Sequence, residues 1–312
     1  MNRRETIRSR VLRGIALNRQ PGFHFPGNFL DVSFDRVARD ASRLSVAPGA
    51  WCTDADGQTD FGSLAILADL ALAACMRAHL GRATRLATVS MHLQFTGAPR
   101  AGRLAATGRF QGFLRHGAGR LGMSGISVEG KAGLVCYGSG TFMALEPPRN
   151  VTLHPLPLRT RKSPEPRRLM EKDLETSEKE ILRHADAVLA EVALHGGAFI
   201  QRFWGFRPHR TSNGAESTLR NGLRVGNRVG HAQGGILLGM AAATAAAALP
   251  AHWLLSGISA WYTSPGDGQR LRASSNVVHH GRLTAVVRTR ITGRNRRCVL
   301  EVVTTHCAAG SG

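Results

Sequence analysis

Residues 61–75 read FGSLAILADLALAAC, and this run of small and apolar residues guides the interpretation of the rest of the chain. Its single charged residue is Asp69. A run that is apolar on every side predicts a helix buried on all faces, which a sheet must wrap. A carboxylate inside such a helix costs roughly several kcal/mol unless hydrogen bonds or a cation compensate it, and such groups concentrate where chemistry is done. Asp69 is therefore the first candidate for a functional residue.

Two helices of this kind are predicted. The first spans residues 61–80 and is closed by Gly81, and the second spans residues 233–249 and is ended by Pro250. The second helix opens with the glycine-rich run GHAQGG at residues 230–235. It has the glycines but lacks an acidic residue.

Each helix is followed by four strand-like runs that are separated by Gly, Pro and Arg turns. These runs are residues 88–95, 103–113, 120–128 and 133–143 in the first half, and 254–263, 269–279, 283–292 and 298–306 in the second. The tripeptide Gly119-Arg120-Leu121 recurs as Gly281-Arg282-Leu283 at the corresponding turn. The chain therefore reads as an internal duplication.

The segments that precede the two helices are less regular. Before the first helix we expect a basic helix packed on the domain at residues 1–20, extended segments at 23–37 and 42–46, and a turn at 54–57. Before the second we expect a helix rich in Glu and Lys at its start at 175–192 and one further strand at 218–225.

The chain of 312 residues is long enough for two domains of about 150 residues. A Pro- and Arg-rich stretch with little apolar periodicity separates the halves. We predict an N-terminal domain at 1–148, a linker at 149–172 and a C-terminal domain at 173–312. The predicted fold class is α+β, with each half an antiparallel sheet wrapped around a long central helix and the two sheets joined edge to edge.

The composition limits the partners. A formal net charge of +20 indicates an anionic partner, such as nucleic acid, an acidic carrier protein or coenzyme A. Only two tyrosines and few other aromatic residues are present, which disfavours nucleic acid. Five cysteines without CxxC spacing indicate neither zinc nor disulfides, and His279-His280 lacks a third metal ligand. Without a membrane-spanning or signal segment, we expect no membrane partner and a cytoplasmic location.

The duplicated pattern resembles the hotdog fold, in particular thioesterases of the phenylacetate-pathway (PaaI-like) type, here as a fused double hotdog. Those proteins carry an Asn, six residues later a His or Gln followed by Gly-Gly at a helix N-terminus, and an acid further into the helix. The second repeat has Asn227 and Gln233-Gly234-Gly235, but Ala242 at the position of the acid. The first repeat has Asp69, with Asp54 and Asp60-Phe61-Gly62 at the earlier positions. Each repeat has what the other lacks.

The resemblance implies one competent site between the repeats, in which Asn227, Gln233 and Gly234 face Asp69. The backbone N–H of Gly234 would stabilise the charge that develops on a thioester carbonyl. Asp69 would act as general base or nucleophile, and Thr88 would position water. The equivalent site with Asp54, Phe61 and Ala242 should be inactive.

Two further features are interpreted from their positions. Arg120 and Arg282, at the repeated turn, are candidates to contact the phosphates of coenzyme A or the acidic residues of an acyl carrier protein. His24-Phe25-Pro26-Gly27 is similar to a motif of hotdog dehydratases, but it lies well before the central helix and is interpreted as a turn. No serine-hydrolase elbow or P-loop is present, and no glycine-rich dinucleotide motif stands at a strand-to-helix junction.

The leading hypothesis is an acyl-CoA thioesterase, with coenzyme A as part of the substrate and no separate cofactor. An acyl carrier protein thioester is the alternative substrate, and a homodimer of fused double hotdogs is expected by analogy. A non-catalytic protein of the same fold that binds acyl thioesters or apolar ligands is the first alternative. A basic nucleic-acid-binding protein is the second, and acyl transfer or hydration in the same fold also remains open.

Overall fold

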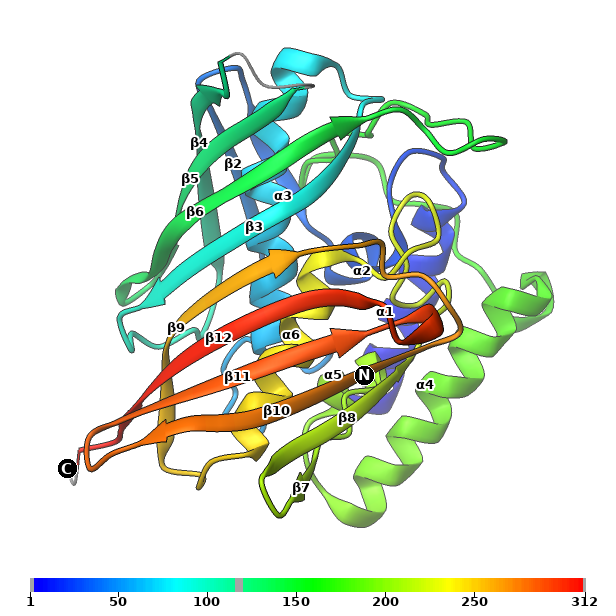
Figure 1. Cartoon of the computed structure of the whole chain (residues 1–312). Helices are drawn as coiled ribbons and strands as arrows, with labels where there is room; N and C mark the ends of the chain where they lie inside the picture. The colour runs from blue at the N-terminus through cyan, green and yellow to red at the C-terminus, as the bar shows by residue number, and fades with distance from the viewer. Residues whose placement is uncertain (1–2, 116–119, 311–312) are drawn as a thin grey trace.

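The computed structural model describes residues 3–115 and 120–310, and it places every described strand in one antiparallel sheet (Figure 1). The strand order is β1-β2-β4-β5-β6-β3-β9-β12-β11-β10-β8-β7. The strands of the first half are β1 Ser33–Val37, β2 Ala41–Val46, β3 Arg85–Phe95, β4 Leu104–Phe113, β5 Leu121–Gly130 and β6 Gly133–Leu145. Those of the second half are β7 His209–Thr211, β8 Gly214–Arg220, β9 Trp253–Tyr262, β10 Arg270–His280, β11 Thr284–Thr292 and β12 Cys298–Ala308.

The two halves of the sheet repeat one another and meet at a single pair of strands. Strands β4, β5, β6 and β3 occur in the same spatial order as β10, β11, β12 and β9. Strands β3 and β9 pair in antiparallel register from Ser90↔Trp261 to Gln94↔Gly257. The predicted duplication and the predicted edge-to-edge joining of the two sheets are therefore confirmed.

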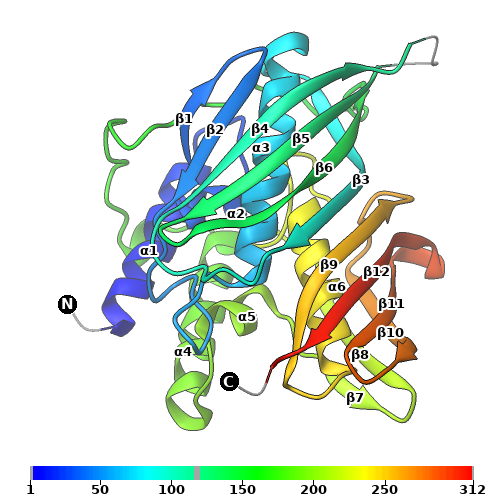
Figure 2. The same cartoon turned by 90° about the vertical axis from the view of Figure 1, so that its left-hand side faces the viewer.

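The two apolar helices α3 (Phe61–Leu80) and α6 (Gly234–Ala247) lie behind these strands (Figure 2). Each begins at a side chain that caps its first turn. Asp60 Oδ2 accepts a hydrogen bond from the backbone N of Ser63 (3.1 Å), and Gln233 Oε1 accepts one from the backbone N of Ile236 (2.9 Å). The helix starts and the Gly81 end were thus readable from local sequence, because capping depends on neighbours within one turn.

The helices α3 and α6 cross antiparallel at unusually close range. A Cβ added to Gly235 would lie 2.5 Å from the backbone N of Ile66, and one added to Gly239 would lie 2.7 Å from Gly62 Cα. Gly62 and Gly235 occupy equivalent positions in the two repeats, so the contact has approximate two-fold symmetry. Glycine at these positions lets the two backbones touch.

Four more helices form a layer on the side of α3 that faces away from the sheet (Figure 2): α1 Arg3–Asn18, α2 Phe25–Leu30, α4 Thr176–His195 and α5 Phe199–Trp204. Helix α1 packs on the fold, as predicted, with Ile7 and Val11 fully buried. The rings of Phe29 and Phe203 lie 4.8 Å apart between α2 and α5, and Arg19 pairs with Glu178 of α4 at 2.6 Å. This layer joins helices from both halves of the chain.

The Pro- and Arg-rich stretch forms neither helix nor strand between β6 and the short 3₁₀ helix η1 (Glu171–Asp173). Its backbone instead bonds to the first half, where Arg159 O accepts from Phe34 N (2.8 Å) and Leu156 N donates to Arg82 O (3.1 Å). The second 3₁₀ helix, η2, is Arg294–Arg296. The domain boundaries at 148 and 172 remain a prediction.

Three local predictions differ from the structure. The segment 23–37 is not wholly extended, and the motif that starts at His24 is not a simple turn, because Phe25–Leu30 forms helix α2. His24 Nδ1 caps this helix by accepting from Gly27 N (3.1 Å). The strand predicted at 218–225 is β8 and ends earlier, at Arg220, where the chain turns at Gly222 (φ +156°). Gly119 of the repeated tripeptide lies outside the described residues.

The glycine crossing generates a stability prediction. Gly235→Ala should lower the free energy of unfolding by about 1–3 kcal/mol, because its Cβ would meet backbone atoms of α3 that cannot rotate away. Gly125→Ala is the matched control, since its Cβ would meet the flexible Gln111 side chain at 3.4 Å and Gly138 O at an ordinary contact distance of 3.7 Å. Urea unfolding measures both variants, and equal midpoints for the two would contradict the close crossing.

Candidate active site

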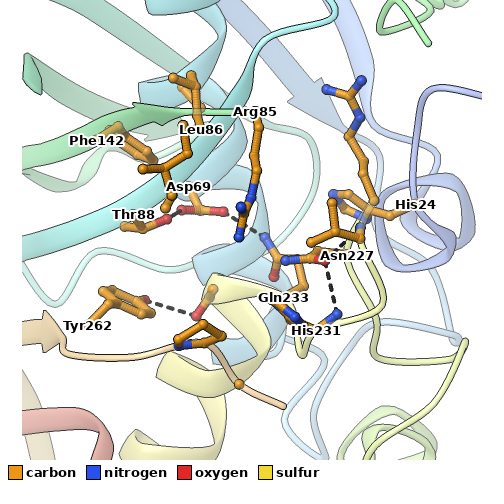
Figure 3. Close-up of a pocket in the computed structure, with 18 of the residues that line it drawn as sticks. His24, Asp69, Arg85, Leu86, Thr88, Phe142, Asn227, His231, Gln233 and Tyr262 are labelled. Atoms are coloured by element: carbon orange, nitrogen blue, oxygen red, sulfur yellow. Dashed lines mark hydrogen bonds between the residues drawn. The ribbon is translucent and has the colours of Figure 1, made fainter. Parts of the chain in front are cut away.

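A cavity of about 390 Å³ lies at the N-terminus of α6, between the two halves of the chain (Figure 3). Its walls come from α3, from the start of β3, from the end of β9 and from the loop that leads into α6. The apolar lining includes Leu70, Leu86, Phe142 and Leu237. Polar side chains from both repeats converge inside it, which is the usual composition of a small-molecule site.

Asp69 lies on the cavity wall and is 8% exposed. Thr88 Oγ1 donates to its Oδ1 (2.9 Å) and Gln233 Nε2 donates to its Oδ2 (2.7 Å) (Figure 3). Burial raises the pKa of Asp69 to about 6, against the opposing effects of the Thr88 hydrogen bond and the positive charge of Arg77. A carboxylate with this pKa is ionised at neutral pH and is a stronger base than an exposed one.

Gln233 connects the carboxylate to the helix. Its Oε1 caps α6 by accepting from Ile236 N, so its Nε2 is the group that faces Asp69. The two residues are 164 positions apart in sequence and come from different repeats. The side-chain amide of Gln233 therefore both orients Asp69 and caps the N-terminus of α6.

Gly234 is the first residue of α6 and lies against Asp69 and Thr88. A Cβ at this position would be 3.2 Å from Thr88 Oγ1 and 3.3 Å from Asp69 Oδ1, so a side chain would fill the space in front of the carboxylate. The hydroxyl of Tyr262 donates to Gly234 O (2.9 Å), which fixes the orientation of the peptide. We call the part of the cavity formed by Asp69, Thr88, Gln233 and Gly234 a corner, and the matching place in the other repeat the equivalent corner. Because the first turn of a helix has N–H groups without intrahelical partners, this corner can stabilise an oxygen that becomes negatively charged.

The equivalent corner of the other repeat is built differently. Ala242 follows Gly235 by seven residues, just as Asp69 follows Gly62, so this corner has no acid at the position of Asp69. Phe61 stands where Gly234 stands, and its ring packs against Phe95 with centroids 5.6 Å apart. The space that is open beside Gly234 is therefore occupied here.

The two acids of that corner have local roles. Asp60 caps α3, and burial raises its pKa to about 6. Asp54 Oδ1 accepts from the backbone N atoms of Asp56 and Gln58, and its Oδ2 pairs with Arg100 (3.2 Å). Asp54 therefore holds the turn at 54–57 that the sequence predicted.

Asn227 lines the cavity, but its carboxamide oxygen is engaged in the loop. Oδ1 accepts from Val229 N (2.9 Å) and from His231 N (3.1 Å). The side chain thus shapes the loop that delivers Gln233 and Gly234. The structure brings together all five residues that the sequence proposed for catalysis, and it gives Asn227 contacts with the loop rather than with Asp69.

The two arginines predicted to bind phosphate are not part of the cavity lining. Arg120 O accepts from Ala144 N (3.0 Å), which places this residue near Leu145 at the cavity end of the sheet. Arg282 lies next to Leu283, whose carbonyl accepts a hydrogen bond from Ala308 N, and Ala308 pairs with Trp253 at the start of β9. Arg282 is therefore at the opposite end of β9 from Tyr262, which lines the cavity. The ten residues of β9 separate those ends by about 30 Å. The assignment of Arg282 to this site is therefore corrected.

Sequence reasoning missed the basic residues that do line the cavity, namely His24, Arg77, Arg85, Arg228 and His231. One signal was available for Arg77, which follows Asp69 by eight residues on the same helix and so lies two turns further along a nearby face. No such signal exists for His24, which reaches the cavity through the packing of α2.

Neither a metal site nor a membrane span stands out in the part of the chain that the structure describes. No cluster of three or more His, Cys, Asp or Glu side chains that could hold a metal occurs among residues 3–115 and 120–310. Helix α3 is long and apolar enough to cross a membrane, but 83% of its apolar stretch is buried inside the fold. We interpret it as a core helix.

Comparison with known proteins gives structural likeness and no sequence match. No protein-family model and no curated protein matches the chain. Among solved structures, a protein described as an oleoyl thioesterase from Lactobacillus plantarum is 10% identical and aligns over 87% of this chain and 97% of its own, with a TM-score of 0.53. The 12:0-ACP thioesterase from Umbellularia californica is 10% identical over 85% of this chain and 93% of its own, with a TM-score of 0.52.

A third structure, described as a thioesterase II from Thermobifida fusca, is 13% identical over 90% of this chain and 96% of its own, with a TM-score of 0.50. These neighbours are hotdog-fold thioesterases, and they cover both halves of the chain. At this identity the likeness shows the fold, which is a double hotdog.

The raised pKa of Asp69 generates a prediction about stability and pH. The folded protein holds the proton to about pH 6, whereas the unfolded chain releases it near 3.8, so ionisation of Asp69 costs folding stability as the pH rises through 6. Asp69→Asn should therefore be more stable than the wild type at pH 8, by about 2–3 kcal/mol. The difference should shrink toward pH 4. Thermal unfolding across this range tests it, and a difference that does not change with pH would contradict the assignment.

Proposed function

We propose that the protein is a thioesterase that hydrolyses acyl thioesters at the single corner formed by Asp69, Thr88, Gln233 and Gly234. One observation carries the proposal. A buried carboxylate of the first repeat is hydrogen-bonded to the residue that caps the central helix of the second, directly beside the open N-terminus of that helix. A base and an anion-stabilising group are the two elements that thioester hydrolysis needs.

The mechanism follows from the geometry. The thioester carbonyl lies at the N-terminus of α6, where the N–H group of Gly234 stabilises the oxygen as negative charge develops. Asp69 removes a proton from a water molecule as the water oxygen attacks the acyl carbon. The tetrahedral intermediate then collapses, the C–S bond breaks, and protonated Asp69 returns the proton to the departing thiolate. Free acid and thiol are the products.

General-base catalysis fits the carboxylate better than nucleophilic attack. Both oxygens of Asp69 already accept a hydrogen bond, from Thr88 and from Gln233. Such bonds stabilise the anion and hold it rigidly, which reduces its reactivity toward carbon but keeps it able to accept a proton. In this mechanism Thr88 orients Asp69, and the water molecule that Asp69 activates approaches from the cavity side.

We further propose coenzyme A as the carrier. The net charge of +20 favours an anionic ligand, and Arg85 of β3 lines the cavity at the end of the sheet where Arg120 also lies. These two residues are the candidates to contact the phosphates, with an acyl carrier protein as the alternative. Assignment to the PaaI-like type, a cytoplasmic location and a homodimer of double hotdogs belong to the same proposal.

The first functional prediction concerns which corner works. Asp69→Asn should lower kcat by about 100-fold or more on a good acyl-CoA substrate while largely preserving KM, because it removes the base and keeps the shape. Gln233→Ala should lower kcat by about 10- to 1000-fold through loss of orientation. The control is Asp60→Asn, which keeps a good helix cap in the inactive corner and should change kcat little. Full activity in Asp69→Asn together with loss in Asp60→Asn would assign catalysis to the other corner.

The same base predicts the pH profile. A general base must be deprotonated, so kcat/KM should fall as the pH drops through about 6, the pKa of Asp69. Thiol release measured from pH 4.5 to 8.5 checks this. A profile that is flat across pH 6 would remove Asp69 from the chemical step.

Isotope labelling separates base from nucleophile. In a single turnover in ¹⁸O-water with excess enzyme, general-base catalysis places the label in the acid product and none in the protein. A nucleophilic Asp69 would first form an anhydride, whose hydrolysis can place the label in the Asp69 carboxylate. Mass spectrometry of the Asp69 peptide distinguishes the two results.

A further inference from the structure

Three basic side chains line the cavity on the side of α3 beyond Asp69, and none of them makes a hydrogen bond or ion pair with a carboxylate of the described residues. They are His24, Arg77 and Arg228. Among the residues that the structure describes, Arg77 makes no hydrogen bond or ion pair, and its Nε is buried without a partner. Arg228 Nη1 and Nη2 bond only to the backbone carbonyls of Arg82 and His154, and its Nε is also buried and unpartnered.

The charges of this group are mutually unfavourable in the unliganded protein. Burial, together with the positive charge of Arg228, lowers the pKa of Arg77 to about 10, and the negative charge of Asp69 opposes the shift. Burial also lowers the pKa of His24 to about 3, with Arg77 and Arg228 adding to the effect, so this ring is neutral. Two guanidiniums whose Nε atoms are buried, beside a single carboxylate, leave one positive charge that a ligand can neutralise.

His24 is oriented to donate a hydrogen bond. Its Nδ1 accepts from Gly27 N (3.1 Å) as the cap of α2, so the proton of the neutral ring is on Nε2. The side chain is 6% exposed and lines the cavity. The group therefore offers two guanidiniums and one neutral N–H, a set that suits a carboxylate.

The distance from the reacting carbon suits the far end of an acyl chain. Arg77 follows Asp69 by eight residues, which is about 12 Å along a helix. The side chain of a helical arginine leans back toward the N-terminus, and thus toward Asp69. Leu70 and Ala73 line the cavity between the two, which gives an apolar path for methylene groups.

We propose that His24, Arg77 and Arg228 form a subsite for the terminal carboxylate of a dicarboxylic acyl group, so that the preferred substrate is a medium-chain dicarboxylic acyl thioester. The inference rests on the proposed thioesterase function for the position of the reacting carbon. A phosphate of coenzyme A is the other source of an anionic oxygen. Leu153 and Leu156 of the linker segment line the cavity and His24 is almost fully buried, which favours a slim carboxylate over a phosphate that carries the rest of coenzyme A.

The test compares two substrates of equal carbon number, adipoyl-CoA and hexanoyl-CoA, at pH 8, where Asp69 is ionised whether or not Arg77 is present. Wild type should have the higher kcat/KM on adipoyl-CoA, by at least about 10-fold. Arg77→Met and Arg228→Met should each lower the adipoyl-to-hexanoyl ratio by at least about 30-fold, as for loss of one partner of a buried charge pair. Arg272→Met, an exposed arginine of β10, is the matched control and should leave the ratio unchanged. An equal preference in wild type, or a ratio that Arg77→Met does not change, would overturn the proposal.

A binding measurement that needs no catalysis separates this proposal from the thioesterase function. Free adipate should raise the melting temperature of wild type and of Asp69→Asn more than hexanoate does, and Arg77→Met should abolish the difference. If no thioester is cleaved but adipate binds in this way, the subsite stands and the hydrolytic function fails. If adipate has no effect while free coenzyme A stabilises wild type but not Arg77→Met, the anion is a phosphate and the carboxylate proposal is wrong. Arg77→Lys, which keeps the charge, should retain part of the adipate shift and shows that a loss in Arg77→Met is not a folding defect.

Discussion

The close antiparallel contact between α3 and α6 determines where the functional groups of this protein lie. Gly235 packs on the backbone of Ile66, and Gly62 packs on Gly239 by the equivalent contact. With no Cβ between them, the helices approach until the N-terminus of α6 meets the middle of α3. Asp69 is the residue of α3 at that level, and a shift of one turn would place it out of reach of Gln233.

The two-fold symmetry of this contact creates two corners, and the sequence has made them different. One corner has Gly234 and Asp69, and the other has Phe61 and Ala242 at the same positions. A single large ring closes the second corner, where Phe61 packs on Phe95. In a duplicated fold one corner can therefore have catalytic residues while the other is filled by packed side chains, because the close contact between α3 and α6 is compatible with either set of residues. The capping residues Asp60 and Gln233 differ in the same way: both cap the N-terminus of their helix, but only Gln233 also donates a hydrogen bond to an acid, Asp69.

Burial supplies the electrostatics of the cavity. Asp69 keeps a raised pKa because its hydrogen-bond partners, Thr88 and Gln233, are neutral, so they orient it without the full stabilisation that an adjacent cation would give. Further along α3 the situation is reversed, since Arg77 and Arg228 both line the cavity with a buried, unpartnered Nε and without an acid as hydrogen-bond partner. The cavity therefore has an acidic end beside the helix start and a basic end beside α2. Such a polarity orients any ligand that carries charge at one end only.

The sequence by itself determined the elements and their duplication. The apolar run at 61–75, the caps at Asp60 and Gln233 and the alternating strands are local patterns, so helices, strands and the asymmetry between Asp69 and Ala242 could be read from neighbouring residues. The resemblance to hotdog thioesterases then suggested which residues meet. Only the tertiary structure decided that Asn227 bonds within its own loop, that Arg282 lies at the far end of β9, and that His24 and Arg77 share a cavity with Asp69. The physical reason is that side-chain direction and long-range contact depend on how α2, α3 and α6 pack, and no local sequence pattern records that packing.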